Sequence, residues 1–211
     1  MNAADFIITS SYQEIIGTPE MIGQYESYKC FTMPEMYHVI DGIDLFNPKF
    51  NMVPPGVNEN IFFPYSQKEG RDPLLTRQVH DLLFHKKNSQ IFGHLDHPNK
   101  RPIFTLAPIT SVKNLTGLVE CFGKSKALQE RCNLILLTSK LHVFETTHPE
   151  EAEEIQKIHD IIHKYHLQGN IRWIGMRLPL REIGEAYRVV ADSRGIFIHF
   201  ALFDILSNRI F

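Results

Sequence analysis

The amino-acid sequence predicts an α/β fold, built on a parallel sheet with helices on both faces. From Pro102 onward, short apolar runs alternate with amphipathic segments of helix length. The runs are apolar throughout rather than at every second residue, which is typical of strands buried on both faces. The chain has 211 residues, 43% of them hydrophobic and 22% charged, enough for one domain or for one domain and part of another.

The expected elements of this α/β region follow one another in a regular order. A helix is expected at about 74–87, and the polar segment 92–102 is interpreted as a linker. Strands are expected at 102–107, 133–138, 171–175 and 195–200, with helices at about 113–130, 149–167 and 180–192 between them.

The N-terminal part of the chain is richer in loops. An apolar run at Phe6–Ile8 predicts a strand, and residues 12–16 have a helix-like pattern. A second apolar stretch covers 37–46. Pro54–Gly56 follows a short expected strand and is interpreted as a crossover into the next domain.

Composition and charge give no support to several classes of protein, although they leave room for a local basic patch. Lys and Arg number 22 and Asp and Glu 24, so the net charge is −2, and no block of like charge supports binding to nucleic acid or a membrane surface. The N-terminus lacks the features of a signal peptide, and no run of 18 apolar residues exists. Cys30, Cys121 and Cys132 have no paired spacing, so they are expected to be buried, reduced thiols of a cytoplasmic protein.

Two apparent motifs are better explained without a ligand. His159, His163 and His166 share one helix face, but they flank an apolar stripe and lack the H-E-x-x-H pattern, so a boundary face is favoured over a metal site. The Gly-Lys-Ser at 123–125 would need a glycine at the position of Leu118 to be a P-loop. Neither a metal nor a cofactor is expected.

The best candidate for binding a ligand lies between the first expected strand of the sheet and the helix that follows it. Parallel sheets bind ligands outside the carboxyl ends of their strands, which here means the turns after 107, 138, 175 and 200. Lys113 and Asn114 open a helix after such a strand, where free N–H groups and the helix dipole favour an anion. A phosphate-binding lysine and a solvated lysine both fit this position.

Several long stretches resemble sucrose synthase, especially its cyanobacterial form. They are "MNAADFIITSSYQEI", "IGQYESYKCFTMPEMYHVIDGIDLFNPKFNMVPPGVNENIFFPY", "VKNLTGLVECFG" and "NIRWIG", and the similarity extends over nearly the whole chain. The resemblance implies a retaining glycosyltransferase of the GT-B type, with two Rossmann-like domains facing across a cleft. It implies reversible conversion of sucrose and UDP to fructose and UDP-glucose, and a family homo-oligomer.

The resemblance also implies a domain division and a fragment. Residues 1–60 correspond to the end of the first Rossmann-like domain and the crossover, and 61–101 to a helix and linker entering the second domain. Residues 102–211 correspond to a truncated nucleotide-binding domain. We therefore expect an internal, partly degenerate piece of the family's sequence.

The resemblance further implies particular site residues. In the family, the turn reads approximately M-A-R-L-D-R-V-K-N, and its Arg and Lys hold the diphosphate; here Lys113 is present, Asn114 follows it, and Pro108 stands in place of the Arg. The first of two sugar- and ribose-binding glutamates corresponds to Asp204, and the second would fall one residue past position 211. Arg177 lies where the family contacts uracil, although a plain surface arginine fits equally well.

Two interpretations of function stay open. The first is a piece of a UDP-glucose:fructose transferase, with Lys113 and Asp204 as catalytic residues and Lys113, Asn114 and Arg177 as nucleotide-binding residues. The second is a remnant without catalysis that binds nucleotide weakly or acts through contacts with another chain. A split enzyme completed by a neighbouring polypeptide lies between the two, and Pro108 counts against it, because proline supplies neither a cation nor an N–H. Thr138–Lys140 replaces a small glycine-containing turn of the family and is expected to crowd the ligand's approach.

Overall fold

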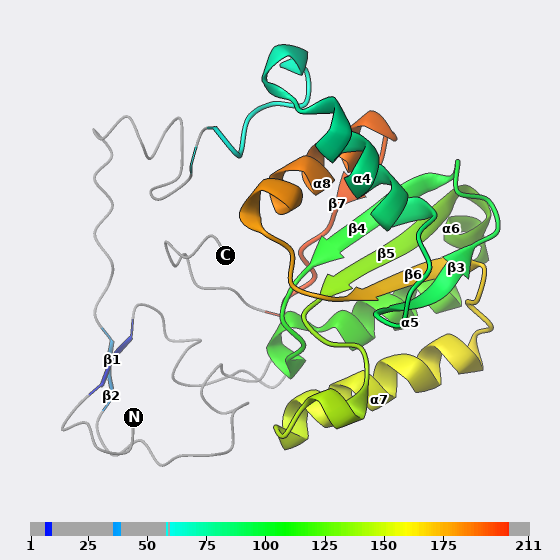
Figure 1. Ribbon diagram of the computed structural model, residues 1–211. Coiled ribbons are helices and arrows are strands. Elements are labelled where there is room, and N and C mark those ends of the chain that lie inside the picture. Colours follow the sequence, from blue (N-terminus) through cyan, green and yellow to red (C-terminus); the bar gives the residue numbers. More distant parts are fainter. Residues whose placement is uncertain (1–6, 10–35, 39–57, 59, 203–211) are drawn as a thin grey trace. The chain divides into compact units, whose positions relative to one another are not determined.

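The chain divides into two compact units, which are described separately. The computed structural model describes residues 7–9, 36–38, 58 and 60–202 (Figure 1). The first unit comprises Met1–Val57 with Ala201–Phe211, and the second comprises Asn58–Phe200. In the first, β1 (Ile7–Thr9) pairs in parallel with β2 (Met36–His38). The expected helix at 12–16 and the crossover at Pro54–Gly56 lie outside the described residues.

The second unit is built on a five-stranded sheet with the order β3-β6-β5-β4-β7. Four of its strands run in parallel and β3 is antiparallel to β6, so the α/β class with a mostly parallel sheet is confirmed. Their bounds are β3 (Ile91–Leu95), β4 (Arg101–Leu106), β5 (Cys132–Thr138), β6 (Asn170–Gly175) and β7 (Ile196–Phe197). The last strand is much shorter than the expected 195–200, and both of its side chains are exposed.

The expected linker at 92–102 is wrong, because it overlaps an edge strand. β3 pairs with β6 in the register Gly93 opposite Arg172. Gly93 has φ +77°, and a Cβ added there would lie 2.4 Å from the carbonyl oxygen of Ile171, so only glycine allows the two backbones to pair this closely. The strand has no fully buried residue, which is why its sequence lacks the apolar run of the central strands.

Helices connect the strands, and a short 3-10 turn precedes each of α4, α5 and α7. The α-helices are α4 (Pro73–Phe84), α5 (Leu115–Lys124), α6 (Lys126–Arg131), α7 (Pro149–Lys164) and α8 (Leu180–Asp192), and the 3-10 turns are η1 (Lys68–Gly70), η2 (Ser111–Lys113) and η3 (Val143–Glu145). The single helix expected at 113–130 is interrupted by Ser125, whose extended backbone ends α5 and whose hydroxyl oxygen accepts from Leu128 N to cap α6.

Helices cover both faces of the sheet, as the continuous apolar strands predicted. α5 and α7 lie on one face, and α4 and α8 lie on the other (Figure 1). Side chains of each strand alternate between the two cores: Leu134 and Leu136 pack towards α5 and α7, whereas Ile135 and Leu137 pack towards α4 and α8. Because both faces are buried, every position of β5 from the second onward is apolar or hydrogen-bonded.

One buried charge was not expected from the sequence. Arg172 lies in β6 with 1% of its surface exposed. Its guanidinium donates to the carbonyl oxygen of Leu82 at 2.8 Å and to that of Lys86, near the C-terminal end of α4, where carbonyl groups lack helical partners. Burial lowers the pKa of Arg172, although Asp81 opposes the shift. This side chain therefore attaches α4 to the sheet.

The cysteine prediction is partly wrong. Cys121 is exposed on α5 and Cys132 is half-buried at the start of β5, and both are free thiols. The absence of paired spacing indicates reduced cysteines but does not determine burial, and on α5 the nearby Val119 and Phe122 are the residues that face the core. Within the described residues, no helix combines the length and the apolar character needed to cross a membrane.

Candidate functional site

The strand order identifies one place at the carboxyl edge of the sheet. The chain passes from β4 to β5 and β6 on one side, and then returns to β7 on the other side of β4. Open α/β sheets bind ligands at such a topological switch point. The segment after β7 continues beside β4, since Ile198 N donates to Phe104 O at 2.8 Å. The candidate site therefore centres on the turns after β4 and β7.

The turn after β4 holds Lys113 and Asn114 in a defined geometry. Pro108 is exposed in this turn, and Thr110 Oγ1 accepts from Lys113 N at 3.4 Å. Asn114 has a left-handed backbone with φ 51°, and its Oδ1 accepts from Gly117 N at 3.2 Å. Asn114 is thus the N-cap of α5, a role that sequence reasoning missed although Asn at a helix start is its usual signal. Lys113 stands one residue before the cap, half-buried at the carboxyl edge.

Two glutamates at the start of α7 join the turns after β4 and β5. Glu150 Oε1 accepts from Ser111 N at 3.0 Å and from Ser111 Oγ at 2.7 Å. Glu151 accepts from Lys140 Nζ and from Thr146 Oγ1, both at 2.5 Å. Burial alone would raise the pKa of Glu151, but these hydrogen bonds outweigh it and lower the pKa. The chain's own carboxylates therefore occupy the donors of Ser111 and Lys140.

The turn after β5 is packed internally. Thr138 Oγ1 donates to Lys140 O at 2.6 Å and accepts from Trp173 Nε1 at 2.9 Å. A Cβ on Gly175 would lie 2.5 Å from the Cβ of Leu141, so β6 passes close to this turn. The side chains of Thr138 and Lys140 therefore make their contacts within the chain.

The other predicted site residues are more widely spread. Arg177 is exposed in the turn between β6 and α8, and β5 separates β6 from β4. Asp204 lies outside the described residues. His159 Nε2 lies 2.9 Å from Leu141 O, and His166 follows the end of α7 with φ 51°. Within the described part of the chain, no group of three or more His, Cys, Asp or Glu residues is arranged to hold a metal ion.

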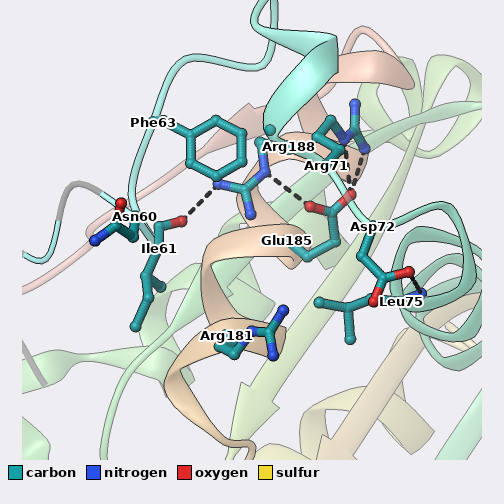
Figure 2. A pocket seen from close by; sticks show the side chains of 10 residues that line it. Asn60, Ile61, Phe63, Arg71, Asp72, Leu75, Arg181, Glu185 and Arg188 are labelled. Carbon is teal, nitrogen blue, oxygen red and sulfur yellow. Dashed lines mark hydrogen bonds and ion pairs between the residues drawn. The ribbon is translucent and has the colours of Figure 1, made fainter.

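A cluster of charges lies away from this edge, between α8 and the segment that leads into α4. Glu185 is 1% exposed, and its carboxylate accepts from Arg71 and Arg188 (Figure 2). It also accepts from Thr76 Oγ1 at 2.7 Å. The Arg71 Nη2 to Glu185 Oε1 distance is 2.5 Å and the Arg188 Nε to Glu185 Oε2 distance is 2.8 Å. The Arg188 guanidinium also lies 3.8 Å from the centre of the Phe63 ring.

This cluster is structural in character. The pocket that it lines encloses about 30 Å³, and the Arg71, Glu185 and Arg188 side chains are already paired within it. Arg188 Nη1 additionally donates to Ile61 O at 2.7 Å (Figure 2). The sequence gives little indication of this cluster, because Arg71 and Glu185 are 114 positions apart. Only the Glu185–Arg188 pair on α8 has the three-residue spacing of a helical ion pair. The cluster holds the segment before α4 against α8.

The cluster predicts a loss of stability in acid. Burial alone would raise the pKa values of Glu185 and Asp192, but hydrogen bonds from Arg71 and neighbouring groups lower both. A carboxyl with a lowered folded-state pKa stabilises the fold above its ordinary pKa, and this contribution disappears as the pH falls through the folded value. We expect the urea concentration at the unfolding midpoint to decrease as the pH is lowered below about 4. Asp192→Asn should make the midpoint less dependent on pH, and a wild-type midpoint that stays constant into this range would contradict the assignment.

Comparisons with known proteins agree with this fold and show which proteins the chain is similar to. The family model described as "Sucrose synthase first GT-B domain" matches residues 1–84, which ends at the last residue of α4. The sucrose synthase of Thermosynechococcus vestitus is 56% identical over 211 residues, covering 100% of this chain and 26% of the relative. That of Melioribacter roseus is 48% identical over 205 residues, covering 97% of this chain and 26% of the relative. Sucrose synthase 2 of Arabidopsis thaliana is 45% identical over 205 residues, covering 97% and 25%.

The chain spans about a quarter of the length of these curated relatives. Identity at this level over almost every residue, together with the mostly parallel α/β sheet, leaves one family assignment. The chain belongs to the sucrose synthase family.

Proposed function

We propose that this chain is the nucleotide-binding part of a sucrose synthase, in which glucose passes reversibly between sucrose and UDP. In that reaction a β-phosphate oxygen of UDP bonds to C1 of the glucosyl group as the bond to fructose breaks, and the fructose oxygen takes up a proton. The observation that carries the proposal is Lys113, which stands before the cap of α5 at the carboxyl end of β4. UDP or UDP-glucose, with sucrose or fructose, are the proposed substrates, and a homo-oligomer in the cytoplasm is the proposed state.

The role proposed for Lys113 is electrostatic. A diphosphate that gains or loses a glucosyl group changes the charge on its oxygens, and a positioned cation stabilises the more negative form. The N-terminal end of α5 adds the positive end of a helix dipole to the same place. Lys113 then binds the diphosphate, and Asn114 keeps α5 in position by capping Gly117.

A second candidate function is nucleotide binding without transfer. Pro108 favours it, because the turn that offers Lys113 has no second cation at that position. Glu150 favours it as well, since its carboxylate takes the N–H and hydroxyl of Ser111 in the same turn. Both features reduce the stabilisation of negative charge in this turn, which transfer requires.

We expect the purified chain to bind UDP and to show no transfer by itself. Titration calorimetry should give a saturable UDP signal that Lys113→Ala weakens at least about tenfold, because a hydrogen bond to a charged group contributes about 1.5–3 kcal/mol. Lys87→Ala is the control for the loss of a lysine elsewhere, since Lys87 is exposed and lies before β3, away from the turn that holds the half-buried Lys113. Sucrose with UDP, and UDP-glucose with fructose, should remain unconverted.

The two candidate functions make different predictions here. UDP-glucose released in a sucrose-dependent manner, above a sample without protein, would show transfer and remove the second candidate. Equal UDP affinity in wild type and Lys113→Ala would contradict the site, and no UDP binding at all would overturn both candidates.

A further inference from the structure

The carboxylate of Glu150 holds the start of η2, the short turn that ends in Lys113. Its Oε1 accepts from Ser111 N at 3.0 Å and from Ser111 Oγ at 2.7 Å. The side-chain contact inside the turn, from Lys113 N to Thr110 Oγ1, is longer at 3.4 Å. Ser111 is the first residue of η2, where a backbone N–H has no partner within the helix. The half-buried Glu150 supplies that partner from a different element.

A simpler explanation would be that Glu150 stabilises only its own helix. Glu150 and Glu151 both lie in the first turn of α7, where negative charge complements the helix dipole. That effect needs no particular hydrogen-bond partner. Among the described residues, however, both hydrogen bonds that the Glu150 carboxylate accepts come from Ser111, 39 positions earlier in the chain. The side chain therefore connects two elements as well as completing one.

We propose that Glu150 is a positioning residue for Lys113, because it fixes η2 and so holds the lysine at the carboxyl end of β4. This inference rests on the proposed function and extends it from the lysine to the contact that holds its turn. η2 covers only Ser111–Lys113, so fixing its first residue limits the movement of its last. Val112 between them is buried, so apolar packing holds the middle of the turn while Glu150 holds its start.

Glu150 is itself held by its neighbour in the sequence. Glu151 accepts from Lys140 Nζ and from Thr146 Oγ1, both at 2.5 Å, in the connection between β5 and α7. The first turn of α7 is therefore attached to the connection after β5 as well as to η2. A group that positions another needs such support, because an unsupported glutamate side chain samples many rotamers.

Charge and position act in opposite directions at Glu150, and this allows an experiment to separate them. The carboxylate brings negative charge to the turn in which Lys113 is proposed to bind a diphosphate, so its charge by itself weakens binding of an anion. Glutamine keeps an Oε1 acceptor for both donors of Ser111 but removes the charge. Alanine removes the acceptor and the charge. The comparison of these two neutral variants therefore isolates the contribution of position.

The test measures the affinities of the full chain for pyrophosphate and for UDP by titration calorimetry. We expect Glu150→Gln to bind both ligands at least as tightly as wild type. Glu150→Ala should bind them at least about fivefold more weakly than Glu150→Gln, because it lacks the two hydrogen bonds that hold η2. With Lys113→Ala as the background, the two Glu150 variants should bind equally, because no lysine is left to position. A purely structural role would weaken binding in both backgrounds.

Glu154→Ala is the matched control on the same helix. Glu154 also accepts from a hydroxyl on the other side of the α5–α7 contact, Thr116 Oγ1 at 2.6 Å, but Thr116 lies in α5 rather than in η2. We expect this variant to bind pyrophosphate as wild type does. Circular dichroism of each sample reports whether the variant is folded. If Glu150→Ala is unfolded, Ser111→Ala replaces it, and the loss of one hydrogen bond should weaken binding about twofold to threefold.

The remaining outcomes would each reject part of the proposal. Equal affinities of Glu150→Gln and the variant without the acceptor would overturn the positioning role and leave the proposed function standing. Equal weakening by Glu150→Ala and Glu154→Ala would also overturn it, because the loss would then come from the packing of α5 against α7. A difference that persists without Lys113 would show that Glu150 does not act through the lysine. Failure of wild type to bind either ligand would overturn the proposed function, and the positioning role with it.

Discussion

Pro108→Arg is expected to raise turnover at least about tenfold in a chimera that carries this chain's site in an intact enzyme. In the chimera, residues 1–199 replace the matching part of the Thermosynechococcus vestitus sucrose synthase, whose own sequence continues from position 200. Under the proposed function, Lys113 binds the diphosphate in this chimera without an arginine at position 108, and a second positioned cation is typically worth about 10²–10³ in rate. We expect less than the full range, because proline constrains the turn and Ile109 is buried in its present conformation.

The measurement is turnover at saturating UDP, which separates a chemical defect from a binding defect. Pro108→Ala is the matched control, because it removes the constraint of the proline ring without adding a cation. The turnover of the Pro108→Arg chimera should clearly exceed that of the Pro108→Ala chimera. Equal turnover with proline, alanine and arginine would show that this position is not what limits the site.

Glu185→Gln is expected to destabilise the fold by about 3–5 kcal/mol, the usual cost of removing one member of a buried ion pair. The substitution keeps the shape of the side chain but removes the charge that Arg71 and Arg188 both contact. Arg71 keeps its ion pair with Asp192 at 2.5 Å, whereas Arg188 loses the carboxylate with which it pairs. Exposed fractions of 7% for the Arg71 side chain and 6% for that of Arg188 mean that water cannot replace that charge.

Urea unfolding followed by circular dichroism measures this change, with Glu130→Gln as the control. Glu130 is an exposed helical glutamate, so the same chemical change there should alter stability by less than about 0.5 kcal/mol. A similar midpoint for Glu185→Gln and Glu130→Gln would show that the cluster contributes no net stability.

Local sequence patterns determined most of the regular elements. The helix expected at 180–192 is α8, Leu180–Asp192, because its amphipathic pattern faces one core along its whole length. The expected strand at 133–138 is within one residue of β5. The spacing of apolar residues indicates whether a segment forms a helix or a strand and which face it buries. Both depend on residues that are only a few positions apart.

Tertiary structure decided the features that depend on distant residues. The strand order, rather than any motif, selected the turns after β4 and β7 from four candidate turns. β3 exists as a strand because Gly93 fits against Ile171, and Arg172 is tolerated in the core because Leu82 and Lys86 present free carbonyl groups to it. In each case a partner about 80 positions or more away supplies the compensating contact. The sequence by itself therefore determined the class of fold and the family, whereas the role of Lys113 stays a prediction. Long-range partners meet the cost of burying polar groups, and this cost decided where those groups lie in the fold.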